Sequence, residues 1–216
     1  MRYLPLSLVL GLGALAGCSE SGALGQSSVS QACASSDAQC GLKGLDAPLA
    51  VGASQPLDIN VEIQGSSAPP ITLLSANDEV FTVEGQLVNG KGPGVATLLV
   101  TSEKSVVLDF VHLWVQIATD LALSRRADDG AVIGDMPGNL QLLVGDEVRV
   151  SVSALSTTQP LVGAPPATWS ADAAVVSLLD EGIPGRVRVV AHGPGKTTVT
   201  CSALDLKTSF DVEVLP

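Results

Sequence analysis

The chain has 216 residues and a formal net charge of −11, with 22 acidic against 11 basic side chains. So acidic a chain offers no positive field to nucleic-acid phosphates, and we expect no nucleic-acid partner. Aromatic residues make up only 3% of the chain, while 22 glycines and 13 prolines interrupt it. This composition is typical of short strands joined by many turns.

The first 17 residues have the layout of a secretory signal peptide. One basic residue, Arg2, precedes an apolar run from Tyr3 to Leu15, and the small residues Ala16 and Gly17 follow. An uncleaved membrane anchor is disfavoured, because a spanning helix needs roughly 20 apolar residues and the run is shorter. A plain signal peptide is the remaining alternative.

The next residue is a cysteine, and Leu15-Ala16-Gly17-Cys18 resembles the lipobox of bacterial lipoproteins. That resemblance implies cleavage before Cys18 and attachment of a diacylglycerol to its sulfur, so that lipid holds the mature chain at a membrane of the cell envelope. Ser19, rather than aspartate, follows the cysteine, which by the same resemblance implies the outer membrane.

Residues 18–44 are predicted to form a flexible tether, because they are rich in Ser, Gly, Ala and Gln and cannot bury enough apolar area to order themselves. Cys33 and Cys40 lie in this segment. We expect a disulfide between them, since an exported chain meets an oxidising compartment and no cluster of His, Asp or Glu completes a metal site.

After the tether the sequence repeats itself. Three motifs recur in the same order: Val51-Gly52 with Val144-Gly145, Ala68-Pro69-Pro70 with Ala164-Pro165-Pro166, and Gly92-Pro93-Gly94 with Gly193-Pro194-Gly195. Matches in register over this distance predict two related domains. We place the first at residues 45–117 and the second at residues 118–216.

Both domains are predicted to be β throughout. Residues 57–63 and 148–154 alternate apolar and polar side chains, which is typical of an antiparallel strand with one face on a core. Further short runs are separated by Gly, Pro, Asn or Asp, and no segment has the helical apolar period. The sequence therefore predicts an all-β fold of two tandem β-sandwiches.

The second domain also resembles a known family. Its Leu143-Val144-Gly145-Asp146-Glu147, Ala167-Thr168-Trp169-Ser170, Val175-Val176-Ser177 and Gly193-Pro194-Gly195 segments follow the order of the group 2 bacterial immunoglobulin-like domain, found in intimin and invasin stalks. The resemblance covers about residues 140–216 and implies immunoglobulin-like sandwiches. The first domain departs from the pattern, with Leu73 in the place of Trp169.

Candidate contact residues occur where residues 110–117 are apolar on both alternating faces. The simplest interpretation is that Phe110, His112 or Trp114 packs against the neighbouring domain at the 118 boundary, and the alternative is an exposed partner surface. Trp169 and the lone Cys201 are expected in the core of the second domain.

No catalytic motif is present in the sequence: it has no Gly-x-Ser-x-Gly elbow, phosphate-binding glycine loop or His-Glu-x-x-His. We predict no enzyme, no cofactor and no metal site. Asp128, Asp129 and Asp135 are the one arrangement worth testing for calcium, and they lack the spacing of a calcium loop.

These features together predict a non-enzymatic, lipid-anchored envelope protein that displays immunoglobulin-like domains to a protein or glycan partner in adhesion or macromolecular binding. The alternative is a periplasmic spacer or an accessory subunit of an envelope complex. An exposed apolar patch on the first domain would favour binding, whereas a rigid junction and well-covered faces would favour the spacer.

Overall fold

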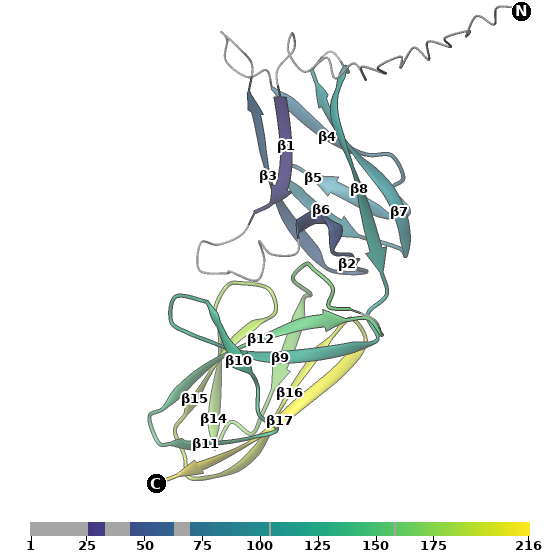
Figure 1. Cartoon of the computed structure of the whole chain (residues 1–216). Helices are drawn as coiled ribbons and strands as arrows, with labels where there is room; N and C mark the ends of the chain where they lie inside the picture. Colours follow the sequence, from purple (N-terminus) through teal and green to yellow (C-terminus); the bar gives the residue numbers. More distant parts are fainter. Residues whose placement is uncertain (1–25, 33–43, 63–69, 104, 158) are drawn as a thin grey trace, which may run out of the picture.

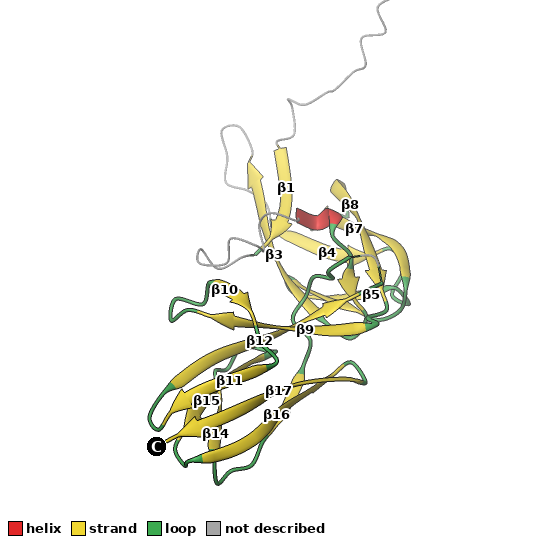
Figure 2. Cartoon of the chain, turned by 60° about the horizontal axis from the view of Figure 1, so that its bottom comes forward, coloured by secondary structure: helices red, strands yellow, loops and turns green. Residues whose placement is uncertain are grey.

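A computed structural model describes residues 26–32, 44–62, 70–103, 105–157 and 159–216 (Figure 1). Cys18, Cys33 and Cys40 lie outside the described residues, so the lipid attachment and the disulfide stay predictions. In the described part of the chain, no helix is long and apolar enough to cross a bilayer. Its one helical element is the short turn η1 (Gly44–Asp46), and strands dominate Figure 2.

Domain 1 consists of two facing four-stranded sheets. The first has the order β1 (Gln26–Gln31), β3 (Ser54–Glu62), β6 (Leu87–Gly90) and β5 (Phe81–Glu84). The second has the order β2 (Leu49–Ala50), β8 (Val107–Gln116), β7 (Gly94–Ser102) and β4 (Ile71–Ser75). All neighbouring strands are antiparallel except β2, which runs parallel to β8.

Domain 2 is built in the same way. One sheet has the order β10 (Val132–Asp135), β9 (Asp120–Arg126), β12 (Glu147–Leu155), β15 (Arg186–Ala191) and β14 (Val176–Asp180). The other has the order β11 (Asn139–Leu143), β17 (Leu206–Leu215), β16 (Gly195–Ala203) and β13 (Ala167–Ser170), with β11 parallel to β17.

The two domains therefore share one topology. Strand for strand, β1-β3-β6-β5 corresponds to β9-β12-β15-β14, and β2-β8-β7-β4 corresponds to β11-β17-β16-β13. This is the order of an immunoglobulin constant-type sandwich whose first strand is divided between the two sheets. The prediction of an all-β fold with two tandem immunoglobulin-like sandwiches is confirmed.

Strand β1 is a departure from the sequence prediction. Gln26–Gln31 lie inside the segment predicted as a tether, yet they pair with β3 from Gln26 opposite Glu62 to Gln31 opposite Leu57. The prediction of a flexible tether is wrong for these six residues. The physical reason is that the pairing uses backbone groups of both strands, while Val29 alone among the β1 residues packs against the core of domain 1 as a partly buried hydrophobe.

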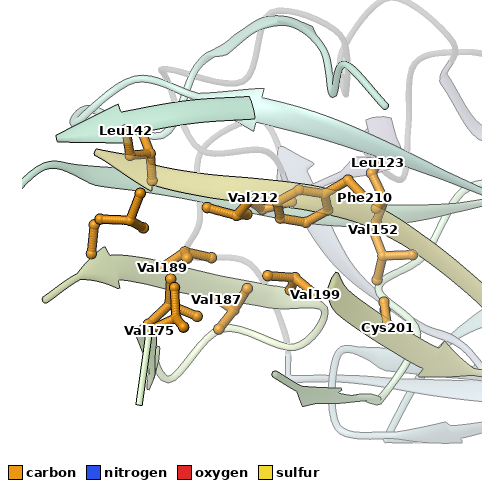
Figure 3. Packing of buried hydrophobic residues seen from close by; sticks show 14 of the residues in the cluster. Leu123, Leu142, Val152, Val175, Val187, Val189, Val199, Cys201, Phe210 and Val212 are labelled. Carbon is orange, nitrogen blue, oxygen red and sulfur yellow. The ribbon is translucent and has the colours of Figure 1, made fainter. Parts of the chain in front are cut away.

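The core of domain 2 lies between its two sheets and is shown in Figure 3. Cys201 is fully buried there and lies next to Val152 of β12, as the sequence prediction of a core thiol requires. Burial raises the pKa of the Cys201 thiol to about 11. In domain 1 the same position on β7 is Val100, because Leu73 pairs with Val100 as Trp169 pairs with Cys201.

The repeated Gly-Pro-Gly motif has the same role in both domains. The amide of Gly92 donates to the carbonyl of Val80, and the amide of Gly193 donates to that of Val175. A Cβ atom at Gly92 would lie 2.7 Å from the carbonyl oxygen of Glu79, and one at Gly193 would collide with the carbonyl of Ala174. Only glycine lets the loop pass this close to the preceding turn.

Candidate binding face on domain 1

The outward positions of β4, β7 and β8 form a band with no Asp, Glu, Lys or Arg side chain. We call it the apolar face and define it by Leu74, Val95, Leu99, Phe110, His112 and Trp114. Four of its side chains are large, apolar and about half exposed: Phe110 at 58%, Trp114 at 52%, Val95 at 51% and Leu74 at 47%. Exposed apolar groups that are contiguous, rather than scattered, mark interaction sites.

The strand pattern explains why these side chains face outward. On β8 the alternate residues Leu113 and Val115 are buried in the core, so their neighbours along the strand point to solvent. Strand register then aligns the outward residues in rows: Trp114 opposite Val95, His112 opposite Thr97, Phe110 opposite Leu99, and Leu99 opposite Leu74. The apolar face is thus continuous across three strands.

The imidazole of His112 is held in place within this face. Its Nδ1 lies 3.0 Å from the hydroxyl Oγ1 of Thr97 on β7, and its ring centroid lies 5.8 Å from that of Phe110, tilted by 60°. This separation and tilt are typical of attractive contacts between rings. Phe110 and His112 therefore present an ordered aromatic surface.

The same positions in domain 2 are polar. Gly94 pairs with Val115 as Gly195 pairs with Val214, which aligns β8 with β17 and β7 with β16. At the positions of Phe110, His112 and Trp114, domain 2 has Ser209, Asp211 and Glu213, and at the position of Val95 it has Lys196. Thr198 donates to Asp211 at 2.7 Å, where Thr97 contacts His112. An apolar face is therefore not a requirement of this fold.

Charge pairing occupies the equivalent face of domain 2. Lys196 Nζ lies 3.1 Å from Glu213 Oε1, and Gln141 donates to the other oxygen of Glu213 at 3.1 Å. The hydrogen bond from Gln141, followed by Lys196, lowers the pKa of Glu213 below its usual value. This face thus resembles an ordinary solvated protein surface.

The three candidate contact residues from the sequence lie together, and their surroundings differ. Phe110 and His112 are exposed to solvent. Trp114, at the end of β8 nearer domain 2, lines a narrow crevice with Leu49 of domain 1 and Val162 of domain 2. Of the three, Trp114 is the residue that reaches the junction.

The junction itself is formed by a loop that the sequence reasoning did not identify. Two residues of the 160–164 loop of domain 2 pair with the start of domain 1. The Val162 amide donates to the Pro48 carbonyl at 2.8 Å, and the Val162 carbonyl accepts from the Ala50 amide at 3.1 Å. Ala164 and Ser54 exchange two backbone hydrogen bonds, at 2.9 and 3.3 Å. Leu161 is buried in the core cluster of domain 1. The sequence feature that could have predicted this contact is the apolar pair Leu161-Val162 inside a loop rich in Pro and Gly.

Gly163 makes this close approach possible. Its φ of +92° favours glycine, and a Cβ atom there would lie 2.5 Å from Leu49 Cδ1 and 3.0 Å from Ala53 Cβ. On the other side of the junction, Leu204 packs against the cores of both domains. Backbone pairing and shared apolar contacts thus connect the two sandwiches.

Arginines gather on the outer face of the other sheet of domain 2. Arg126, Arg149 and Arg188 lie directly opposite one another on three adjacent strands. Glu181 lies 2.9 Å from Arg149 Nε and 3.9 Å from Arg188 Nε, and Asp128 lies 3.3 Å from Arg149 Nη1. The open depression here, about 390 Å³, is lined by four arginines and four carboxylates, so its charges balance.

The three aspartates considered for calcium take part in other interactions or lie in strands. Asp128 pairs with Arg149, Asp129 Oδ1 accepts a hydrogen bond from the Ala131 amide, and Asp135 lies in β10. Among the residues that the structure describes, no group of three His, Cys, Asp or Glu side chains could hold a metal ion.

Comparison with known proteins gives weak structural similarities. No family model matches the chain, and no curated protein matches it. It is similar to domains 4 and 5 of the S-layer protein SbsC, with 17% identity over 72% of this chain and 82% of that chain and a TM-score of 0.33.

Two adhesins are similar to the chain at a comparable level. The Yersinia pseudotuberculosis adhesin InvE has 13% identity over 90% of this chain and 61% of its own, with a TM-score of 0.34. The Escherichia coli adhesin FdeC has 10% identity over 88% of this chain and 63% of its own, with a TM-score of 0.36. The chain thus spans just under two thirds of each adhesin chain. At these values the assignment of the fold rests on strand order.

Proposed function

We propose that the chain is a non-enzymatic protein of the cell envelope, anchored by lipid on Cys18 in the outer membrane, that binds a macromolecule through the apolar face of domain 1. The observation that carries this proposal is the difference between equivalent strands. Domain 1 exposes Phe110 and Trp114 where domain 2, with the same topology, has Ser209 and Glu213.

The apolar face is chemically suited to a protein or an uncharged glycan. Each aromatic side chain carries 150–250 Å² of surface, so covering the exposed half of Phe110 or Trp114 would contribute roughly 2–3 kcal/mol. Tryptophan and other aromatic residues are common anchors at the centres of interfaces. The face contains no Asp, Glu, Lys or Arg, so the acidic remainder of the chain would orient a partner and discriminate against acidic ones.

A second candidate function is a structural spacer, and the junction favours it. Backbone hydrogen bonds between residues 160–164 and domain 1, with Gly163 fitted against Leu49, hold the two sandwiches in one arrangement. A fixed arrangement is what a spacer or an accessory subunit of an envelope complex requires.

Site-specific crosslinking in intact cells tests the binding function. A photoreactive amino acid in place of His112 should form an adduct with one partner, and the same probe in place of Asp211, the equivalent residue of domain 2, should not. Replacing both aromatic residues with those of domain 2, Phe110→Ser with Trp114→Glu, should abolish the adduct. Equal labelling at both positions, or none at either, contradicts binding through this face.

Accessibility to protease separates adhesion from a spacer function. A tag after Pro216 that protease removes from intact cells, only when Cys18 is intact, places the domains outside and supports adhesion. A tag that is protected until the cells are lysed rules out adhesion to another cell and supports the periplasmic spacer.

A further inference from the structure

The chain enters domain 1 at the end where β8 begins. Gln26, the first described residue, pairs with Glu62 at the end of β3, and the Ser27 hydroxyl donates to Asp109 Oδ2 at 3.2 Å. Asp109 lies two residues after the start of β8 at Val107. Figure 1 shows the starts of β1 and β8 at one end of the molecule and the C-terminus at the other.

The chain before this point is short. Eight residues, 18–25, separate the start of Cys18 from Gln26. Whatever their conformation, eight steps of extended chain span at most about 29 Å. If Cys18 carries lipid, this end of domain 1 is held within that distance of the bilayer.

The same end exposes an apolar pair at the tip of the hairpin between β7 and β8. Val106 is 52% exposed and Val107 is 51% exposed. The Ser102 amide donates to the Val106 carbonyl at 2.9 Å, and the Ser105 amide donates to the Ser102 carbonyl at 2.8 Å, so backbone hydrogen bonds hold Val106 next to Ser102. Ser105, which directly precedes the two valines, has a φ of 59°.

We propose that this end of domain 1 contacts the lipid bilayer, with Val106 and Val107 in the interfacial region of zwitterionic lipid. The inference rests on the lipid anchor of the proposed function. Because a short tether makes the contact intramolecular, two valines suffice where they could not recruit a free protein. The chain as a whole is acidic, with a formal net charge of −11, so anionic lipid is disfavoured.

This contact with the bilayer limits which partners the apolar face can bind. Trp114 lies seven residues beyond Val107 along β8, or about 23 Å at the rise of an extended strand. The face therefore stands close above the lipid headgroups, while domain 2 is the part farthest from the membrane. A partner of the apolar face must itself lie close to the same membrane.

Quenching of tryptophan fluorescence by brominated lipid tests the contact. The full-length lipidated protein is incorporated into phosphatidylcholine vesicles with brominated acyl chains, and flotation establishes whether it is anchored. A tryptophan in place of Val106 reports on the hairpin, and the matched control is a tryptophan in place of Ile133, an apolar residue of domain 2 that is 59% exposed. After subtraction of the signal of the unmodified protein, which contains Trp114 and Trp169, we expect several-fold stronger quenching for Val106→Trp than for Ile133→Trp.

Three other outcomes would overturn the inference in different ways. Floated protein with equally weak quenching in both variants shows an anchored domain that does not touch the lipid. Strong quenching in a Trp169→Phe protein, whose remaining tryptophan is Trp114, shows that the apolar face itself lies on the bilayer. Failure to float refutes the lipid anchor of the proposed function and, with it, the proposed contact with the bilayer.

A measurement without added tryptophan completes the test. In the unmodified protein on vesicles, amide hydrogens of residues 102–110 should exchange several-fold more slowly than in a Cys18→Ala protein in solution. Val106→Ser with Val107→Ser should remove that protection while the protein still floats. Protection that persists in this variant contradicts a contact through the valines.

Discussion

Strands β8 and β17 are the same strand in two copies of one sandwich, and their outward residues differ completely. Domain 1 has Phe110, His112 and Trp114 where domain 2 has Ser209, Asp211 and Glu213. Both strands pair in the same way with their neighbours and bury their inward residues. Folding of domain 2 therefore does not require apolar residues at these outward positions, and the proposed contact with a partner would account for them in domain 1.

The two domains also differ in the side chains on their outer surfaces. Domain 2 pairs its charges internally, Lys196 with Glu213 on one sheet and Arg149 with Glu181 on the other. Domain 1 leaves aromatic side chains uncovered next to a junction that holds it to domain 2. Four predictions, with the largest expected effect first, would break or sharpen this comparison.

Gly163→Val should have the largest effect, because it acts on the connection between the domains. A side chain at a φ of +92°, with its Cβ 2.5 Å from Leu49 Cδ1, adds backbone strain to a collision. We expect a loss of about 3 kcal/mol or more and two separate unfolding transitions in calorimetry. Gly182→Val is the control, since Gly182 has a φ of +70° and no atom near its Cβ position. Equal losses of unfolding free energy in both variants would show that the effect comes from backbone strain and not from the contact between the domains.

Cys201 should make domain 2, unlike domain 1, sensitive to alkaline pH. The thiol has a pKa of about 11 in the folded protein, against an ordinary value of 9.0. Between these values the unfolded chain loses its proton first, so stability is complete below pH 9 and falls as the pH rises, by roughly 2–3 kcal/mol near pH 11. Urea unfolding at pH 8 and pH 10.5 measures this. Cys201→Val, which copies Val100 of domain 1, should abolish the difference; an unchanged pH dependence would refute it.

Glu181→Gln should have a smaller effect. The substitution leaves Arg126, Arg149 and Arg188 facing one another without the carboxylate that lies 2.9 Å from Arg149. We expect a loss of about 1–2 kcal/mol that shrinks as salt is added, measured by urea unfolding at two ionic strengths. Glu147→Gln is the control: Glu147 is 47% exposed against 15% for Glu181 and lies 3.5 Å from Arg188, so it should change little. A larger effect of Glu147→Gln would contradict this.

The exchange Phe110→Ser with Trp114→Glu should have the smallest effect on stability. It introduces the residues that domain 2 carries at the same positions, and both side chains are already half exposed. We expect the free energy of unfolding to stay within about 0.5 kcal/mol while partner crosslinking at His112 is lost. A large loss of stability would show instead that the aromatic residues serve the fold of domain 1.

Much of this architecture could be predicted from local pattern. The alternation in residues 57–63 and 148–154 predicted β3 and β12, and the repeated Gly-Pro-Gly motif predicted equivalent loops, because both reflect requirements of neighbouring residues. Burial of Cys201 followed from the apolar residues of its strand face. Which of Phe110, His112 and Trp114 packs against domain 2 could not be predicted, because alternation alone does not say what lies opposite the second face.

By itself, then, the sequence determined that this protein is two related all-β sandwiches, since side-chain alternation and glycine turns are local properties. Only the tertiary structure decided that Gln26–Gln31 belongs to the first sandwich, since an edge strand is recruited through backbone groups that any residue supplies. It also decided that residues 160–164 connect the domains and that the apolar face is open, because both depend on contacts between residues far apart in the chain.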